Sequence, residues 1–427
     1  MTNPTFKPST LNEWLNYIEA LHPKSIAMGL DRVRDVANRL NLQPTFPIIT
    51  IAGTNGKGST CAMLEAMYAL SGYRVGAYTS PHLQRYNERV RVSQENISDE
   101  DLCAAFNAVE AARGDVALTY FEMGTLAAVW HFVHMDLDVA ILEVGMGGRL
   151  DAVNVFEPSC AIVTSVDLDH MEFLGDTREK IGFEKAGIYR ANIPAICGDE
   201  NPPKSLIDYA TLIGANLHLI NRDFNVKKVV DGLVFCANNV AINLPILALS
   251  GDFQHTNAAC AVSAVQHLTA HLPVSQANIC AALGAVTLMG RFYHIQSNPS
   301  VIVDVAHNPQ AAKSLAHNLQ TTACTGRTLA VFAMLADKDI EGVVSELTPQ
   351  ISAWYLADIH NMRGAKAKDL QVKLNKIQEN ASSQLHKNVA QALCAAYKEA
   401  AKNDRIIVFG SFYTVADAMA TVNDLKT

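Results

Sequence analysis

Residues 48–60 read IITIAGTNGKGST and are the strongest indication of the fold. An apolar run rich in β-branched residues breaks into a turn with three glycines and one lysine, and residues 61–70 then continue as a predicted helix. Glycines let the backbone curl so that its N–H groups point inward, and the lysine adds a positive charge. The turn therefore predicts a phosphate cradle, which the positive end of the following helix would reinforce.

Each part of the cradle has a predicted role. Gly53, Gly56 and Gly58 shape the turn, Lys57 faces phosphate, and the hydroxyl of Ser59 or Thr60 offers a ligand to Mg²⁺. Only Thr54 and Asn55 separate the first glycine from the Gly-Lys pair, whereas the usual P-loop has a longer spacer. The short spacing sets this loop apart from common P-loop proteins.

The pattern of apolar runs predicts an α/β fold with two domains. The 427 residues are too many for one core. Strands predicted at 48–52, 75–79, 139–144 and 160–166 alternate with helices, which indicates a doubly wound, mainly parallel sheet of the P-loop type. A second series, with strands at 301–305, 329–332, 353–356 and 406–409, predicts a smaller Rossmann-like domain. We place the boundary so that the domains are residues 1–295 and 296–427.

Local signals predict three helix starts and a small group of strands. Thr10 and Glu13 form a capping box, Asp176 with Glu179 caps a helix that continues through residue 186, and Asn308 caps a helix over residues 310–319 after Pro309. Residues 215–245 predict short meandering strands at the edge of the first domain.

Composition excludes several classes of protein. The net charge of −8 argues against a nucleic-acid binder, and no apolar run approaches the ~18 residues that span a membrane. Nine cysteines without a CxxC pair favour free thiols over disulfides or zinc. Residues 1–8 lack the apolar segment of a secretory signal, so we expect a cytoplasmic chain.

Polar side chains follow the predicted strands, where ligands of doubly wound sheets bind. Ser80 follows one strand, Glu143 ends another, and Asp167, Asp169 and His170 follow a third. Hard oxygen ligands suit Mg²⁺. A half-buried Glu143 would be costly without a cation, so we expect it to bind metal. For His170, a structural role and a metal-binding role both stay open.

Four further residues remain ambiguous when taken singly. Lys185 near a helix end either complements the helix dipole or, once its charge is reversed by carboxylation with CO₂, serves a metal centre. Asp304 is suited to a ribose, Asn257 to adenine and Arg291 to phosphate, although isolated residues of these types are more often structural.

Six motifs together resemble one family. They are GTNGKGST at 53–60, TSPHL at 79–83, EVGMGGRLDA at 143–152, DLDH at 167–170, EKAGI at 184–188 and DVAHNP at 304–309. The chain resembles folylpolyglutamate synthases of the Mur ligase superfamily over nearly its whole length. Two positions depart from the usual family pattern, Met289 before Gly-Arg and Phe253 before Gln254.

The resemblance implies a role for each site residue. Lys57, His170 and a carboxylated Lys185 would be catalytic. The implied metal ligands are Ser59, Ser80, Glu143 and His170. The implied ATP contacts are Gly53, Thr54, Asn55, Gly56, Lys57, Gly58, Ser59, Thr60, Asn257, Arg291, Asp304 and His307.

Three segments are similar to the bacterial bifunctional branch, which combines dihydrofolate synthase with folylpolyglutamate synthase. In that branch they shape the dihydropteroate or folate site. The matching residues are Gly29, Leu30, Asp31, Arg32, Thr119, Tyr120, Phe121, Glu122, Leu150, Asp151 and Ala152.

The implied activity is ATP-dependent amide formation through an acyl phosphate. L-glutamate would join dihydropteroate, giving dihydrofolate, or reduced folates, giving folylpolyglutamates. The implied cofactors are two Mg²⁺ ions, with a monovalent cation left open, and we expect a monomer. The domain 1–295 would bind ATP and folate, and 296–427 would be the glutamate-ligase domain. A monofunctional folylpolyglutamate synthase is the main alternative; a muramyl ligase or a P-loop switch fits less well.

Overall fold

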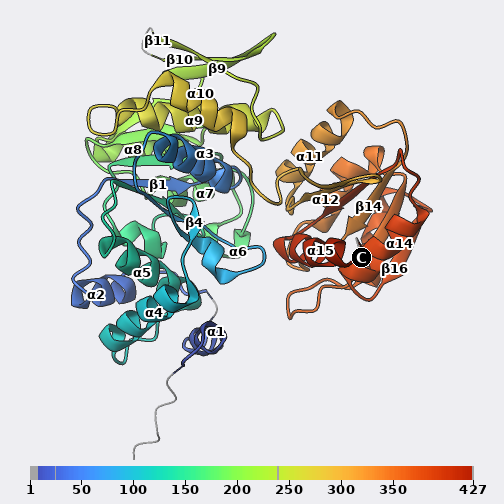
Figure 1. The fold of residues 1–427 in the computed structure, drawn as a ribbon, viewed down its shortest axis with the longest axis horizontal. Helices are drawn as coiled ribbons and strands as arrows, with labels where there is room; N and C mark the ends of the chain where they lie inside the picture. Colours follow the sequence, from blue (N-terminus) through green and yellow to red (C-terminus); the bar gives the residue numbers. More distant parts are fainter. Residues whose placement is uncertain (1–7, 25, 238–239, 426–427) are drawn as a thin grey trace, which may run out of the picture. The chain divides into compact units, whose positions relative to one another are not determined.

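The computed structural model describes residues 8–24, 26–237 and 240–425. Its contacts divide the chain into two compact units (Figure 1). The first comprises Met1–Leu247 and His255–Val286, and the second comprises Ala248–Gln254 and Thr287–Thr427. This division lies earlier than the predicted boundary after residue 295, because strand β12 (Tyr293–Ser297) pairs with the next strand of the second unit.

The first unit is built on an eight-stranded sheet, which confirms the predicted doubly wound fold. The strand order is β4-β3-β2-β5-β1-β6-β7-β8. The parallel strands are β2 (Val75–Tyr78), β5 (Val139–Glu143), β1 (Ile48–Ala52), β6 (Cys160–Val163), β7 (Pro194–Cys197) and β8 (Asn216–Leu219). The short β3 (Val90–Val92) and β4 (Glu95–Asn96) pair antiparallel at one edge. β1 is buried throughout, as a strand covered on both faces should be.

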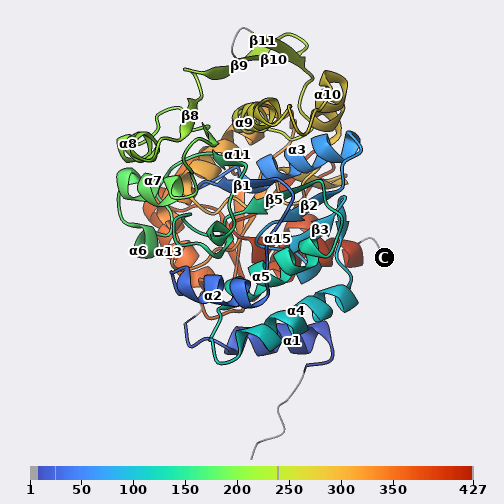
Figure 2. The same ribbon diagram turned by 90° about the vertical axis from the view of Figure 1, so that its left-hand side faces the viewer.

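Helices cover both faces of this sheet (Figures 1 and 2). On one face lie α3 (Lys57–Leu70), α9 (Phe253–His267) and α10 (Gln276–Ala285). The other face packs against α1 (Leu11–Ala20), α2 (Asp31–Arg39), α4 (Asp99–Arg113), α5 (Tyr120–Val133), α7 (Arg178–Ala186) and α8 (Lys204–Ile213). Short connections contain η1 (Tyr86–Arg89), η2 (Ala152–Val155) and α6 (Met171–Leu174).

Two helix starts differ from the sequence-based prediction. Helix α3 begins at Lys57 rather than at residue 61, because Gly56 adopts a left-handed conformation (φ 88°) that leads directly into the helix. Helix α7 is capped by Thr177, whose hydroxyl accepts from the Lys180 N–H, and not by Asp176. The predicted capping box of α1, by contrast, is confirmed at Thr10 and Glu13.

The segment after β8 forms a small separate sheet. Strands β9 (Phe224–Val229), β10 (Gly232–Ala237) and β11 (Val240–Leu244) pair antiparallel in the order β11-β10-β9. The sequence predicted these strands and β8 as one meander at the sheet edge. The structure instead pairs β8 with β7, so β8 belongs to the parallel sheet.

The second unit carries a six-stranded sheet in the order β12-β13-β17-β14-β15-β16. β13 (Ser300–Asp304), β17 (Arg405–Phe409), β14 (Thr328–Phe332), β15 (Ala353–Ala357) and β16 (Ser383–His386) are parallel, and only β12 is antiparallel. The helices are α11 (Pro309–Thr321), α12 (Ile340–Leu347), η3 (Thr348–Gln350), α13 (Ala367–Ile377), α14 (Val389–Glu399) and α15 (Phe412–Leu425). The predicted Asn308 cap before Pro309 is confirmed.

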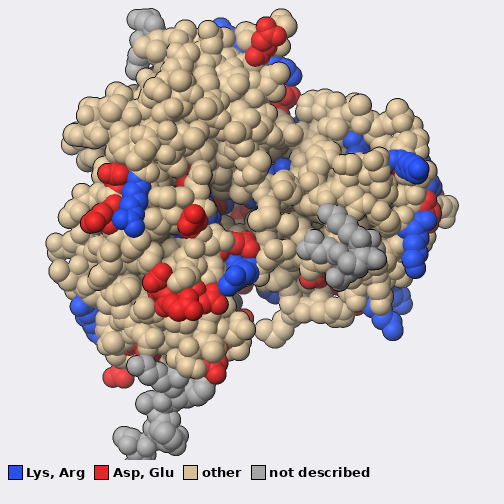
Figure 3. Space-filling model, viewed as in Figure 1, with Lys and Arg blue, Asp and Glu red and all other residues tan. Residues whose placement is uncertain are grey.

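Surface and thiol chemistry agree with an ordinary α/β protein. All nine cysteines are free, as predicted. Within the described ranges, no helix is both long and apolar enough to cross a bilayer. On the face drawn in Figure 3, Lys and Arg side chains stand in separate small groups interspersed with Asp and Glu.

Candidate active site

The glycine-rich turn joins β1 to α3 in the middle of the first sheet. Gly56 is the residue before α3, so the N–H groups of the first helical turn face the loop. A Cβ at Gly53 would collide with the Thr164 hydroxyl, and a Cβ at Gly56 would collide with the Asn257 amide, so both positions need glycine. Lys57 Nζ donates to the carbonyl oxygens of Gly53 (2.9 Å) and Thr54 (3.4 Å). The lysine charge therefore lies inside the curl of the loop.

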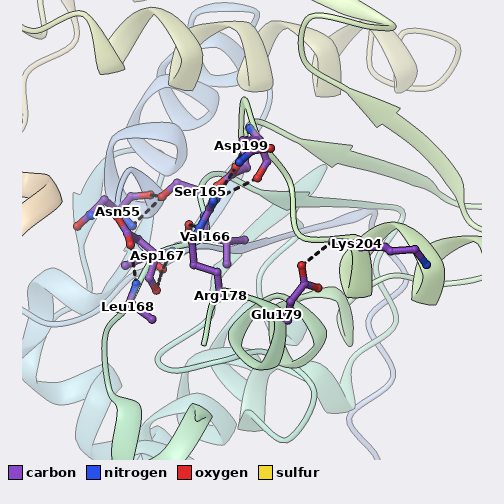
Figure 4. Close-up of polar contacts among 11 residues, drawn as sticks. Asn55, Ser165, Val166, Asp167, Leu168, Arg178, Glu179, Asp199 and Lys204 are labelled. Carbon is purple, nitrogen blue, oxygen red and sulfur yellow. Dashed lines mark hydrogen bonds and ion pairs between the residues drawn. The ribbon is translucent and has the colours of Figure 1, made fainter. Parts of the chain in front are cut away.

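The residues after β6 hold this loop from the side (Figure 4). Thr54 N–H donates to Ser165 O (2.8 Å), and Asn55 N–H donates to Ser165 Oγ (3.1 Å). The Thr164 and Ser165 hydroxyls both donate to Asn55 O, at 2.6 and 3.1 Å. Thr54 Oγ1 accepts from Asp167 N–H (2.9 Å). These bonds fix the loop before any ligand binds.

Strand register brings three of the four predicted metal ligands to the carboxyl ends of the strands in the first sheet. β1 lies between β5 and β6, and Glu143 stands opposite Ile51. Glu143 is 4% exposed, and one of its carboxylate oxygens accepts from Ser80 N–H at 3.0 Å. Ser59 is buried in the first turn of α3. Glu143, Ser80 and Ser59 thus all belong to the segments around the phosphate loop.

His170 has an unusual backbone. Its φ is 50°, in the left-handed region that few non-glycine residues occupy, and it precedes the single-turn helix α6. Its side chain lies 3.7 Å from Asp169 and is 33% exposed. Strain of this kind concentrates at functional sites, which favours the functional reading of His170.

Lys185 and Asp151 are buried groups near the loop. Lys185 is 3% exposed, and burial, followed by the charge of Lys57, lowers its pKa to about 7. Asp151 is 5% exposed, and burial raises its pKa to about 7. The Asp151 oxygens accept from the backbone N–H groups of Met146 and Val153, both at 3.0 Å. Asp151 therefore also organises its own loop, a role that the sequence did not predict.

The three segments of the predicted dihydropteroate site converge. Gly29 N–H donates to Leu150 O at 3.4 Å, which joins the first and third segments. Arg32 forms an ion pair with the buried Glu122 (2.7 Å), which joins the first and second. Phe121 lies so close to Gly145 that a Cβ there would meet its ring at 2.6 Å.

The remaining residues of these segments are placed differently. The Asp31 side chain is fully exposed and lies 3.7 Å from Arg34, so it does not join the Arg32–Glu122 contact. Leu30 precedes α2, and Thr119 caps α5 together with Glu122. Tyr120 packs edge-on against Tyr86 (5.6 Å between ring centroids). Ala152 is buried at the start of η2.

In the second unit, the predicted nucleotide contacts gather at the carboxyl end of β13. Buried Asp304 accepts from the N–H groups of Phe292 and Ala306, both at 2.8 Å, and burial raises its pKa while Arg291 opposes this. Arg291 lies over the Phe412 ring (5.3 Å), and His307 is 6.5 Å from the same ring. His307 Nδ1 is 2.9 Å from Val305 O.

Sequence reasoning missed three contributors. Phe412, the ring shared by Arg291 and His307, gave no signal beyond its place after a strand. A buried ion pair joins Arg91 to Glu65 of α3 (2.7 Å), and Arg91 also donates to Thr79 Oγ1 just before Ser80. The buried Asp199 and the partly exposed Arg178 form a second ion pair, which contacts the loop after β6. Pairs so distant in sequence carry no local pattern.

Two protein-family models match the chain. One, described as "Mur ligase middle domain", matches residues 51–265, and the other, "Mur ligase, glutamate ligase domain", matches residues 290–412. Dihydrofolate synthase/folylpolyglutamate synthase from Escherichia coli (strain K12) is 43% identical over 417 residues, which are 97% of this chain and 96% of the relative.

Solved structures agree with the sequence relatives. E. coli FolC in complex with DHPP and ADP superposes with a TM-score of 0.93 at 42% identity, covering 98% of this chain and 99% of that chain. A bifunctional folylpolyglutamate synthase/dihydrofolate synthase with Mn, AMPPNP and L-glutamate bound superposes with a TM-score of 0.89 at 40% identity, covering 98% and 100%. The chain therefore belongs to the Mur ligase family and, within it, to the dihydrofolate synthase/folylpolyglutamate synthases.

Proposed function

We propose that this chain is an ATP-dependent ligase that joins L-glutamate to dihydropteroate and to reduced folates. One observation carries the proposal: the phosphate loop follows β1, the buried Glu143 ends the neighbouring β5, and the predicted pterin residues Phe121 and Asp151 both contact the loop after β5. A site that holds ATP phosphates beside a pterin is what this reaction needs. The relatives named above support both activities.

The proposed reaction has two steps. A carboxylate oxygen of the folate substrate attacks the γ-phosphorus of ATP, the bond to ADP breaks, and an acyl phosphate forms. The neutral amine of glutamate then attacks the acyl carbon, the bond to phosphate breaks, and the departing phosphate takes up the proton that the nitrogen loses as the amide forms. No side-chain nucleophile is required, because the protein aligns anionic reactants and offsets their charge. Lys57 and the N–H groups at the start of α3 suit that task.

The predicted magnesium ligands fit a Mg²⁺ ion. Glu143 supplies a buried carboxylate, and Ser59 and Ser80 supply hydroxyls on neighbouring segments. Among the described residues, no three His, Cys, Asp or Glu side chains form a metal cluster. Mg²⁺ typically uses only one or two carboxylates together with water and substrate phosphates. When bound, it would neutralise charge on the transferred phosphoryl group.

In the second unit, we propose that Arg291, Asp304 and His307 contact the nucleotide. Arg291 is held over Phe412, which orients its guanidinium, and Asp304 retains lone pairs beyond its two backbone bonds. In the first unit, Asn257 packs on Gly56 of the phosphate loop and is proposed to contact ATP there. Asp304 ends β13, and Asn257 lies near the start of α9.

Lys185 is proposed to be carboxylated. Its pKa of about 7 leaves a neutral amine near physiological pH, and the amine nitrogen can attack CO₂ and lose a proton to give a carbamate. The carbamate carries a charge of −1 beside the predicted metal site, where the protonated lysine would carry +1. The unmodified lysine costs folding free energy that grows as pH falls from 10.5 to about 7 and is constant below that.

A CO₂ requirement is the expected result. In CO₂-depleted buffer, activity should be low at every pH. Bicarbonate should restore activity above about pH 7 and progressively less below it, because the protonated amine cannot attack CO₂. Carbon-13 bicarbonate should add one carbamate NMR signal that is absent from Lys185→Ala. The exposed Lys204 provides the control, since Lys204→Ala should keep the signal. Full activity without CO₂ at neutral pH would contradict the proposal.

The dihydropteroate site predicts a selective effect of Asp151. Asp151→Asn keeps an acceptor for one backbone N–H but removes the charge, so the loop is largely preserved while contact with the pterin weakens. We expect kcat/KM for dihydropteroate to fall about ten-fold or more, with the KM for ATP nearly unchanged. Steady-state assays with each substrate measure this. An equal loss with reduced folate would contradict a site specific for dihydropteroate.

Phosphate release with each folate substrate tests the function itself. The bifunctional enzyme should release phosphate only with glutamate plus either dihydropteroate or a reduced folate. A monofunctional folylpolyglutamate synthase would respond to the reduced folate alone, and a nucleotide switch would hydrolyse ATP without glutamate. We propose that the enzyme works in the cytoplasm, as a monomer, with Mg²⁺. Size-exclusion chromatography with light scattering tests the oligomeric state, and omission of K⁺ tests the need for a monovalent cation.

A further inference from the structure

Asp199 is a buried carboxylate that no part of the proposed reaction uses directly. It follows β7 and is 6% exposed. One of its oxygens accepts from Val166 N–H at 2.7 Å, and the other accepts from Asn201 N–H at 3.0 Å. Arg178, the first residue of α7, donates to both oxygens at 2.9 and 3.0 Å. We call Asp199 and Arg178 the anchor pair.

The anchor pair holds both polar groups of a single peptide residue. Asp199 accepts from the Val166 N–H, while Arg178 Nε donates to the Val166 C=O at 2.9 Å (Figure 4). Two elements distant in sequence, the end of β7 and the start of α7, therefore fix Val166. Since a buried backbone group can rarely lose its partner without cost, this residue cannot shift unless the pair breaks.

Val166 lies between the two residues that form hydrogen bonds with the phosphate loop. Ser165 precedes it and bonds Thr54 and Asn55, and Asp167 follows it and bonds the Thr54 hydroxyl. Four residues after Val166 comes His170, the predicted metal ligand in its strained conformation. Any movement of Val166 thus changes the spacing between the phosphate loop and His170.

We propose that Asp199 and Arg178 are positioning residues for phosphoryl transfer, fixing the segment 165–170 so that the phosphate loop and His170 keep their spacing. The inference rests on the proposed function and adds two residues that touch neither ATP nor metal. Supporting groups of this kind typically change metal affinity or turnover by about 10- to 100-fold when removed. A displacement of about 1 Å is enough for such a loss.

The chain offers a close structural match as a control. Asp404 in the second unit is 4% exposed and accepts from the N–H groups of Arg327 (2.7 Å) and Ala401 (2.9 Å). The Arg327 side chain pairs with it at 2.9 Å. Asp404 precedes β17, at the opposite end of that strand from Phe409. Losing this pair should destabilise the fold in a similar way without disturbing the phosphate loop.

The experiment compares Asp199→Asn with Asp404→Asn in the full-length protein. Three quantities are measured: the melting temperature, kcat at saturating substrates against Mg²⁺ concentration, and Mn²⁺ affinity in the presence of ADP by electron paramagnetic resonance. For Asp199→Asn we expect kcat to fall about 10- to 100-fold. The Mg²⁺ concentration for half-maximal kcat and the Kd for Mn²⁺ should each rise by about 10-fold. Metal-free ADP binding should change less than about 3-fold, since Ser165 and Asp167 still bond the loop directly. Asp404→Asn should lower only the melting temperature.

Arg178→Lys provides a second variant should Asp199→Asn fail to fold. Lysine keeps the charge pair but lacks the forked donors that reach Asp199 and Val166 together, so we expect an intermediate loss. The inference is overturned if folded Asp199→Asn or Arg178→Lys keeps kcat and Mn²⁺ affinity within about 2-fold of wild type. It is also overturned if Asp404→Asn shows the same losses. Absence of glutamate-dependent phosphate release from wild type would refute the proposed function instead, and Mn²⁺ affinity would still test the anchor pair.

Discussion

Replacing Lys57 with alanine is expected to lower glutamate-dependent turnover about 1,000-fold at saturating ATP, as loss of a charge-stabilising donor does in related chemistry. The lysine amine is already inside the loop, bonded to Gly53 O and Thr54 O, so its charge is positioned before ATP arrives. Lys57 is the only positively charged residue of the loop 53–60, so no neighbour on the loop can replace its charge in the alanine variant. The loss should appear mainly in kcat, because charge on the phosphoryl group develops as it transfers.

The same substitution should leave the fold intact. The loop is held independently by Ser165 and Asp167, so Lys57→Ala removes only the bonds to the carbonyl oxygens of the buried Gly53 and the half-buried Thr54. Lys204→Ala, in an exposed pair of α8, provides a matched control with normal turnover expected. Turnover close to wild type in Lys57→Ala would refute the assignment of the phosphate loop.

Features with a local pattern were readable from the sequence. The phosphate loop needed only Ile48–Ala52 and its glycines, since strand, turn and helix follow one another. The Asn308-Pro309 helix start was equally clear, because cap chemistry is local. Glu143 was expected to be half-buried because it ends an apolar strand, and the structure buries it further, to 4% exposed.

Features that depend on distant residues were not readable. Helix α3 begins at Lys57 and not at the predicted residue 61, because Gly56 takes a left-handed conformation. A glycine in a turn permits this conformation but does not require it. Asp151 was predicted as a pterin contact, yet its oxygens also hold its own loop. The Asp199–Arg178 pair spans 21 residues and bonds a third segment, so only the folded chain reveals it.

Loss of the predicted metal ligand Glu143 is expected to have the second-largest effect on turnover. Glu143→Gln is expected to lower turnover by about 100-fold and raise the Mg²⁺ concentration for half-maximal activity by about 10-fold or more. Glutamine has nearly the same shape, and its carbonyl oxygen can still accept from Ser80 N–H, so the strand end should be preserved while the charge is lost. The melting temperature without metal is therefore expected to stay near that of wild type.

Thermal shift separates a metal ligand from a structural acid. Mg²⁺ with a nucleotide analogue should raise the melting temperature of wild type, because a ligand that binds only the folded state stabilises it by an amount that grows with its concentration over its Kd. In Glu143→Gln this metal-dependent part of the rise should nearly disappear, whereas the part due to nucleotide alone should remain. The carboxylate stands opposite Ile51 on the strand that leads into the phosphate loop, so a metal there would lie beside the transferred phosphoryl group. An unchanged Mg²⁺ dependence in both assays would show that Glu143 does not bind the metal.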